Sequence, residues 1–438
     1  MLNLLFTHTL LLYFVQSLWR DEAFSILAAQ QSLVFIVTRL GFEPPVYYAM
    51  LHFWIKIFGS GEVAARSLSL VGFLLSTALM IEWSHTLYKK HWLSWYLPLF
   101  FFLNPMLLYY AFEVRTYGWY IFFATATLIS YSAQQWKLFI VSALLGFYTH
   151  VYMLPFIGIL GLHWLWTNKH AVRELPRFIK KDRGIQSFLI TGALMLPWLI
   201  RIGFEASRMK TSWYYPVDLQ LVRSALGNMF IGYEGTPWYG WTYTFYLSVV
   251  LLLCAWLALT NKLHRKQTQL FILFGVVPLA VVIAISFIKP LFVNRYLIPT
   301  TIAEILVVVA ALSAIRHTVV QKIAAALVLC AVLWVNWWYP PQHAKAPIRN
   351  SFDQINVIAQ PDDIFLAADS IIYLETLYYA RDASRVYLYN PRNNVFPWYI
   401  GDALITPSRM IRDFPLYPMR AILVHPDTSY EIVYRLPI

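Results

Sequence analysis

Two adjacent carboxylates, Asp21 and Glu22, directly follow the first apolar stretch of the chain. A charged side chain at the edge of such a stretch is kept where water, a partner or chemistry requires it. Trp19-Arg20 precede the pair, and the opposite charge of Arg20 favours the ionised form of Asp21. The alternative is a solvated loop or a helix N-cap, where acidic residues are common. We interpret the pair as part of an enzyme that works at a membrane face.

The composition is typical of a chain that crosses a membrane many times. The 438 residues are 59% hydrophobic and 13% charged, whereas a soluble globular chain carries about 25% charged residues. The N-terminus lacks a basic region and a cleavage site, so we expect the first apolar run to remain as an anchor. Apolar windows of sufficient length predict about 11 transmembrane helices, over residues 2–19, 61–82, 93–110, 116–133, 137–152, 153–167, 185–202, 241–260, 268–288, 297–315 and 321–338.

The net charge of +12 reflects loop composition rather than nucleic-acid binding. Lys and Arg lie in short loops between apolar runs, which is the positive-inside pattern. With the N-terminus in the cytoplasm, the cytoplasmic loops contain the most basic segments: Lys89-Lys90, Lys137, residues 169–183, residues 262–266, and Arg316 with Lys322. The outer side then receives a set of polar residues that lie far apart in the chain: Asp21, Glu22, Glu43, Glu113, Arg115, His150, Arg295 and Tyr296. Because the basic loops set the orientation independently, this convergence predicts one shared site.

Two outer loops and the tail complete the predicted organisation. Residues 20–60 are too long and too patterned for a plain connector, and they contain two amphipathic helices, over 22–29 and 46–58. Residues 203–240 form a second outer loop that either caps the site or lies at the interface without a role. We divide the chain into a transmembrane domain over 1–339 and a small extracytoplasmic α/β domain over 340–438. The tail pattern predicts strands over 364–368, 385–389 and 421–424 and a helix over 370–379.

Several of these segments together resemble the GT-C glycosyltransferases, and most closely the protein O-mannosyltransferase and aminoarabinose transferase group. The resemblance covers roughly residues 15–300. Its first signature lies in the first outer loop: Trp19-Arg20-Asp21-Glu22-Ala23, Pro44-Pro45-Val46-Tyr47-Tyr48, Leu51-His52-Phe53-Trp54, Phe58-Gly59-Ser60-Gly61-Glu62 and Arg66-Ser67-Leu68-Ser69. The others are Asn104-Pro105, Tyr109-Tyr110-Ala111-Phe112-Glu113-Val114-Arg115-Thr116-Tyr117, Tyr148-Thr149-His150 and Arg295-Tyr296-Leu297-Ile298-Pro299.

The resemblance implies a GT-C fold and a reaction on the outer side of the membrane. Such enzymes transfer a sugar from a polyprenyl-phosphate carrier to an acceptor, usually with inversion at the anomeric carbon. In this family the Asp of the first loop is the candidate general base or a metal-site carboxylate, a role that carries over to Asp21, and Glu22 matches the second member of the pair. A positioned carboxylate that takes the proton of an acceptor hydroxyl contributes about 10²–10⁴-fold to the rate.

The leaving group in such a reaction is a lipid phosphate, which gains negative charge as the glycosidic bond breaks. Arginine suits it, because the planar guanidinium donates two hydrogen bonds to one phosphate. We predict Arg295 as the first phosphate-binding residue, Arg115 as the second, and Tyr296 beside them. Two alternatives stay open: Arg295 as an interfacial anchor that snorkels to lipid headgroups, and Arg115 as the ion-pair partner of Glu113 at a helix end.

Glu43, Glu113 and His150 are candidates for contacts to the acceptor or to a metal. Relatives often carry an acidic residue just upstream of Pro44-Pro45, but the spacing varies, so the role of Glu43 is open. Together with Asp21, these side chains offer oxygen and nitrogen ligands for a divalent ion. Several relatives work without one, and no local ligand spacing decides between the two cases. His150 is equally well explained as an interfacial histidine whose imidazole is hydrogen-bonded and has no role in the reaction.

The leading hypothesis is therefore an integral membrane glycosyltransferase, whose partners are a polyprenyl-phosphate sugar, membrane lipids and a glycan, lipid or protein acceptor. We expect it in a bacterial inner membrane, with the site facing the periplasm. The runner-up is a transporter or lipid flippase, because Pro155, Pro197 and Pro278 interrupt predicted spans. Against it, the charges gather at helix ends and the sequence has no internal repeat. A non-catalytic scaffold is the third alternative. The sequence identifies neither the sugar nor the acceptor.

Overall fold

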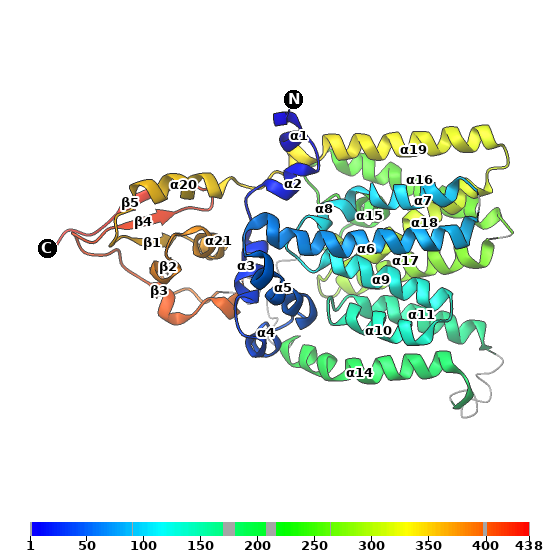
Figure 1. Ribbon diagram of the computed structural model, residues 1–438, viewed down its shortest axis with the longest axis horizontal. Coiled ribbons are helices and arrows are strands. Elements are labelled where there is room, and N and C mark those ends of the chain that lie inside the picture. The colour runs from blue at the N-terminus through cyan, green and yellow to red at the C-terminus, as the bar shows by residue number, and fades with distance from the viewer. Residues whose placement is uncertain are drawn as a thin grey trace.

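The computed structural model describes residues 2–89, 91–169, 180–206, 216–262, 264–396 and 401–437. Most of the chain forms a bundle of long helices, and a small sheet domain at the C-terminal end projects from one end of the bundle (Figure 1). The short helices of the first outer loop lie between the two parts (Figure 1). The N-terminal residues also lie at this end of the bundle.

Six helices in the described part of the chain are long and apolar enough to cross a membrane, so that the chain is an integral membrane protein. They are α6 (Glu62–Tyr88), α14 (Arg183–Ala206), α16 (Gly240–Thr260), α17 (Arg265–Ser286), α18 (Ile298–Ala314, preceded by the 3-10 turn η1, Asn294–Leu297) and α19 (Thr318–Trp338). Shorter helices pack beside them: α7 (Leu93–Phe102), α8 (Pro105–Ala111), α9 (Tyr117–Ser132), α10 (Trp136–Phe147), α11 (Met153–Thr167) and α15 (Leu219–Ile231). The predicted spans from residue 61 onward correspond to these helices, with 93–110 divided at Asn104-Pro105.

The centre of the bundle is α18, whose residues 298–312 are buried on every side. Apart from Thr300, Thr301 and Glu304 this stretch is apolar, as expected of a helix in a core rather than at a surface. Elsewhere the helices approach closely at small residues. A Cβ built on Gly118 would lie 2.0 Å from the carbonyl oxygen of Ser69, so only glycine allows α9 to begin against α6. This contact fixes the position of the loop before α9. That loop carries Glu113 and Arg115.

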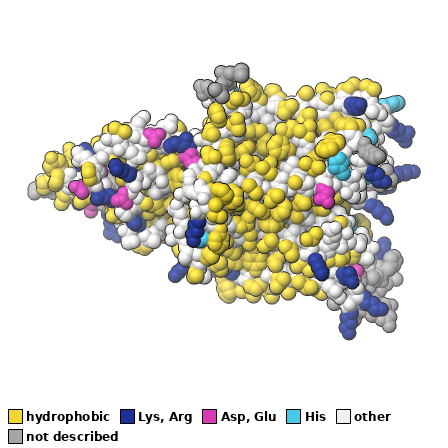
Figure 2. Space-filling view, viewed as in Figure 1, with side chains coloured by type: hydrophobic (Ala, Val, Ile, Leu, Met, Phe, Trp, Pro, Cys, Tyr) yellow, Lys and Arg dark blue, Asp and Glu magenta, His cyan; other side chains and the backbone are white. Residues whose placement is uncertain are grey.

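The surface of the bundle is divided as the loop charges predicted. A broad apolar band covers the helices, and Lys and Arg gather at the end opposite the C-terminal domain (Figure 2). The band consists of exposed apolar side chains such as Leu74, Leu99, Leu196, Leu253 and Leu327. Such a band is the surface expected of helices in contact with lipid.

The predicted first span over residues 2–19 is wrong. Residues 2–15 form two short helices, α1 (Leu2–His8) and α2 (Leu11–Val15). At 1.5 Å per residue, helices of 7 and 5 residues cannot cross a hydrocarbon layer of about 30 Å. The buried guanidinium of Arg66 explains where α2 ends. It donates to the carbonyl oxygens of Phe14, Gln16 and Ser17, which therefore do not continue the helical ladder.

The first outer loop forms three helices: α3 (Arg20–Ala29), α4 (Leu33–Arg39) and α5 (Pro45–Phe58). The two predicted helices are confirmed, and α5 ends as expected at Gly59, which has a φ of +85°. The predicted amphipathic character of α3 does not correspond to an exposed face, because residues 22–29 are all buried. Helix α21 (Ser370–Tyr379) of the C-terminal part packs on α3.

The C-terminal part contains a five-stranded sheet in the order β3-β2-β1-β4-β5. The strands are β1 (Ile364–Ala367), β2 (Val386–Tyr389), β3 (Met410–Ile411), β4 (Ala421–Val424) and β5 (Tyr430–Val433). The first four pair in parallel, and only β5 runs antiparallel to its neighbour β4. Helices α20 (Ile348–Ile358) and α21 pack with the sheet. The predicted helix over 370–379 is confirmed, and it begins where Asp369 caps it by accepting from the N–H of Ile371.

Candidate active site

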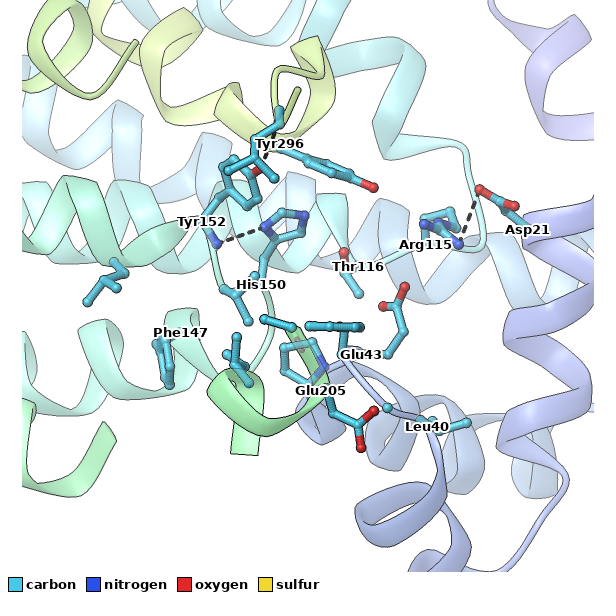
Figure 3. A pocket seen from close by; sticks show the side chains of 18 of the residues that line it. Asp21, Leu40, Glu43, Arg115, Thr116, Phe147, His150, Tyr152, Glu205 and Tyr296 are labelled. Carbon is cyan, nitrogen blue, oxygen red and sulfur yellow. Dashed lines mark hydrogen bonds and ion pairs between the residues drawn. The ribbon is translucent and has the colours of Figure 1, made fainter. Parts of the chain in front are cut away.

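A cavity of about 980 Å³ lies where the bundle, the first outer loop and the C-terminal part meet (Figure 3). Its polar end is formed by Arg20 and Asp21 of α3, by residues 38–44, and by Arg115 and Thr116. Leu374 and residues 401–403 close it from the C-terminal part. Five of the predicted site residues line this one cavity: Asp21, Glu43, Arg115, His150 and Tyr296. The structure brings these five residues to one cavity, whereas Glu22, Glu113 and Arg295 do not line it.

The other end of the cavity is mostly apolar, with the carboxylate of Glu205 at the end of α14 as its acidic residue. Its walls come from the loop and first turn of α11, the end of α14 and the end of α17. The side chains are those of Leu154, Pro155, Leu199, Ile202, Val281 and Ile285. The cavity therefore joins a charged chamber to a hydrocarbon-lined groove within the membrane bundle, which is the shape of a site for an amphiphile.

Asp21 lies in the first turn of α3 and reaches the cavity with 15% of its side chain exposed. The extended backbone of Trp19 starts the helix, so the free N–H groups of its first turn favour a carboxylate there. Two guanidinium groups pair with Asp21: that of Arg20 at 3.1 Å, and that of Arg115 at 3.5 Å (Figure 3). Burial alone would raise the pKa of Asp21, but the charges of Arg115 and Arg20 outweigh it and hold this pKa below its ordinary value. Asp21 is thus ionised at neutral pH.

Glu22 points to the opposite side of α3 and does not line the cavity. Its carboxylate is fully buried and accepts two bonds from Arg66, Nε to Oε1 at 2.9 Å and Nη2 to Oε2 at 2.7 Å. The N–H of Val114 and the Nζ of Lys345 each add a contact at 3.0 Å. Burial opposes the charge, yet Arg66 and Lys345 lower the pKa of Glu22 below its ordinary value. These contacts favour a positioning role, and the predicted catalytic role of Glu22 stays a prediction.

Glu113 belongs to the same buried network. Its Oε1 accepts from Nζ of Lys345 at 3.1 Å, while its Oε2 has no hydrogen-bond partner within the described ranges. Burial and the neighbouring charge of Glu22 raise the pKa of Glu113 despite Lys345. The predicted pair of Glu113 and Arg115 does not form in the described part of the chain, because Arg115 turns to Asp21 and Glu113 turns to Lys345.

Arg295 lies behind the cavity wall rather than in it. Its Nη1 pairs with Oε1 of Glu234 at 3.0 Å, and Glu234 also accepts from the hydroxyl of Tyr110 at 2.5 Å. The guanidinium lies over the rings of Trp19 and Tyr296, 5.9 and 5.8 Å from their centroids. Its charge still contributes to lowering the pKa of Asp21. The predicted role of Arg295 in phosphate binding stays a prediction. The second outer loop meets the site through Glu234.

His150 lies among aromatic rings on the cavity wall. It stacks on Tyr120 at 4.6 Å between ring centroids, and the ring of Tyr296 lies at 5.1 Å. Burial lowers the pKa of His150 to about 3, helped by the charges of Arg115 and Arg295, so the imidazole is neutral. Tyr152, next to it, is held by a bond from its hydroxyl to the carbonyl oxygen of Leu291 at 2.7 Å. These rings form a rigid wall between the charged and the apolar ends of the cavity (Figure 3).

The predicted metal ligands do not gather. Glu43 lines the cavity on the side of Arg115, where its Oε2 accepts from Tyr48 at 3.0 Å (Figure 3). Asp21 is occupied by two arginines, and Glu113 faces Lys345 outside the cavity. No group of three or more His, Cys, Asp or Glu side chains with the geometry of a metal site occurs among the described residues. The residues present do not fit a divalent ion, and we derive no step through one.

Several charged residues in or beside the cavity were not singled out from the sequence. Glu205, Lys289 and Asp402 line the cavity, and Glu234 and Lys345 belong to the ion pairs next to it. Arg66 was visible only as part of a family signature, and Lys345 lies in the short linker after α19, more than 300 residues from Glu22. Glu205 and Glu234 carried a signal that sequence reasoning could have used, since both are acidic residues in an outer loop rich in aromatics.

The helices and this cavity define a class, a polytopic membrane protein with a partly polar cavity at one end of its helical bundle. The chain is similar to the crystal structure of ArnT from Cupriavidus metallidurans in the apo state, with a TM-score of 0.62 and 13% identity over 96% of this chain and 91% of that one. It is similar also to ArnT from the same organism bound to undecaprenyl phosphate, with a TM-score of 0.60 and 13% identity over 96% of this chain and 92% of that one. At this identity the likeness establishes the shared fold. Scans against protein-family models and against curated proteins found no match.

Proposed function

We propose that this protein is a glycosyltransferase that takes a sugar from a polyprenyl-phosphate carrier and transfers it to an acceptor on the extracytoplasmic side. The observation that carries the proposal is the division of the cavity into an ionised chamber around Asp21 and Arg115 and an apolar groove between α11, α14 and α17. A lipid phosphate likewise consists of a charged head and an apolar tail, which match the two parts of the cavity. The binding of undecaprenyl phosphate by the structurally similar ArnT supports it.

In this proposal the prenyl tail lies in the apolar groove and the phosphate lies at the aromatic wall of His150, Tyr152 and Tyr296. The sugar then extends toward Asp21 and Glu43, and the acceptor enters from the side of the C-terminal part. The positively charged bundle end far from this cavity is the cytoplasmic end under the positive-inside rule, so the site faces the exterior or periplasm.

Asp21 acts as the general base. It is ionised, partly exposed to the cavity and held by Arg20 and Arg115, so that it can accept the proton of an acceptor hydroxyl as the new bond to the anomeric carbon forms. Arg115 lies between Asp21 and the aromatic wall, where its charge compensates the charge that develops on the leaving phosphate. Attack from the side of the sugar opposite the phosphate inverts the anomeric carbon.

The test uses purified protein in liposomes and a polyprenyl-phosphate sugar labelled in the sugar. A transferase releases prenyl phosphate and places the label on the acceptor, or on water when no acceptor is present. A lipid flippase instead moves the intact labelled lipid between leaflets. Movement of intact lipid without cleavage of the sugar–phosphate bond, for every donor and acceptor class offered, would reject the proposal in favour of the flippase.

A further inference from the structure

Lys289 lines the cavity, although no family signature and no basic-loop pattern singled it out. It follows α17 by one turn, and its N–H still bonds the carbonyl oxygen of Ile285 at 3.0 Å. Val281, Ile285 and Lys289 are therefore spaced four residues apart on one helical face, and all three line the cavity. A tail that lies along the first two side chains has its head about one helical turn further on, roughly 5.4 Å along the axis, at Lys289.

The segment that carries Lys289 is held in place on both sides. The N–H of Leu291 bonds to the hydroxyl of Ser286 at 3.2 Å, and the carbonyl oxygen of Leu291 accepts from Tyr152. Tyr152 in turn packs against Tyr296, with 5.0 Å between ring centroids. Lys289 is thus anchored beside the aromatic wall, at the point where the apolar groove ends.

The other cations of the cavity are placed differently. Arg20 and Arg115 pair with Asp21, and Arg39 is exposed at the end of α4. The ammonium group of Lys289 makes no hydrogen bond or ion pair within the ranges that the structure describes, and the side chain is half-buried. A lysine that is left unpaired next to an apolar groove is suited to an anion that arrives with a hydrocarbon tail.

We infer that Lys289 binds the phosphate of the prenyl-linked donor and selects prenyl phosphates over uncharged prenyl lipids. The inference rests on the proposed function and names the residue by which the cavity distinguishes charged from uncharged prenyl lipids. Arg115 compensates the charge that appears in the transition state, whereas Lys289 meets the charge that the donor already carries on binding. Loss of Lys289 therefore weakens donor binding more than it slows the transfer step.

The experiment measures the binding of farnesyl phosphate and of farnesol to the full-length protein in detergent. Wild type prefers farnesyl phosphate, and Lys289→Gln raises its Kd about tenfold, as expected for a lost hydrogen bond to a charged group. Lys289→Arg retains most of the affinity, and farnesol binds equally to all variants. Lys266→Gln is the matched control, because Lys266 is exposed at the opposite end of α17 and does not line the cavity. With a labelled donor, Lys289→Gln raises KM more than it lowers kcat.

Two results distinguish a failure of the Lys289 assignment from a failure of the proposed function. If wild type shows no preference for farnesyl phosphate over farnesol, the proposed lipid-phosphate site itself fails. If wild type keeps the preference but Lys289→Gln behaves like Lys266→Gln, only the inference fails, and Lys289 is an interfacial anchor. Equal loss of both ligands in a folded Lys289→Gln variant also overturns it, because the charge selection would then lie elsewhere.

Discussion

The two faces of α3 differ in kind, although their carboxylates are neighbours in the chain. On one face Asp21 opens to a cavity of about 980 Å³ and shares two arginines that also line that cavity. On the other face Glu22 is closed off by Arg66, Lys345 and the backbone of Val114. The open pair is arranged to meet a ligand, whereas the closed network ties α3 to α6, to the loop before α9 and to the linker after α19. A step of one residue along α3 therefore separates the proposed chemistry from positioning.

The largest expected effect comes from Asp21→Asn. Removal of the proposed base, with its shape retained, lowers transfer from a labelled polyprenyl-phosphate sugar by about 10²–10⁴-fold. The unfolding temperature falls less than for Glu22→Gln, because Arg20 is 24% exposed and Arg115 pairs with Asp21 only at 3.5 Å. Asp353→Asn is the control, since Asp353 is exposed on α20 and lies outside the cavity. Full activity of Asp21→Asn would remove Asp21 from the role of base.

The next effect is on stability and belongs to Glu22→Gln. This change leaves the buried charges of Arg66 and Lys345 without their common partner. Breaking a buried ion pair on one side typically costs about 3–5 kcal/mol. We expect a clear fall in the denaturant midpoint of the purified protein.

The matched control for Glu22→Gln is Glu431→Gln. Glu431 pairs with His425 on the surface, where its side chain is 58% exposed, so the change is worth at most about 1 kcal/mol. The comparison between the two faces of α3 breaks down if Glu22→Gln keeps wild-type stability and yet loses transfer as completely as Asp21→Asn. Glu22 would then share the chemistry.

The smallest effect concerns Glu375 of α21, which is buried against α3. Burial raises the pKa of Glu375 to about 8, and the charges of Asp21 and Glu22 add to this. Because the pKa of the folded state lies above that of a free glutamate, the stability from neutral Glu375 is complete below about pH 4.5 and is lost as the pH rises toward 8. Glu375→Gln should match wild type at pH 4.5 and unfold several degrees higher at pH 8. Parallel pH profiles for the two proteins would contradict this.

The sequence predicted the parts of this arrangement that follow local rules. Helix α21 carries its own cap, α5 ends at a glycine, and the basic loops place the polar residues at one end of the bundle. These rules bring Asp21 and Arg115 to the same region from positions more than 90 residues apart. Local and charge patterns were therefore sufficient to place Asp21 and Arg115 at the same end of the bundle.

What the sequence could not predict depends on long-range contacts between buried side chains. The first apolar run looks like a span, yet Arg66 binds its carbonyl groups and ends the helix. Glu22 looks like the partner of Asp21, but Lys345 reaches it from the linker after α19. Arg295 looked like the leading phosphate contact, and its pairing with Glu234 arises from a loop whose path no pattern describes. In each case the contact comes from a partner far along the chain, which local patterns do not reveal.

The most direct test of the account is where a prenyl phosphate lies when it is bound. A prenyl phosphate with a photoreactive group in the isoprene units next to the phosphate is irradiated with the protein, and the cross-linked peptides are identified by mass spectrometry. We predict labels on the groove walls at Leu154–Pro155, Leu199–Ile202 and Val281–Ile285, removed by excess farnesyl phosphate but not by farnesol. Labels confined to the outer faces of α16 and α19, unaffected by farnesyl phosphate, would contradict the claim that this cavity is the donor site.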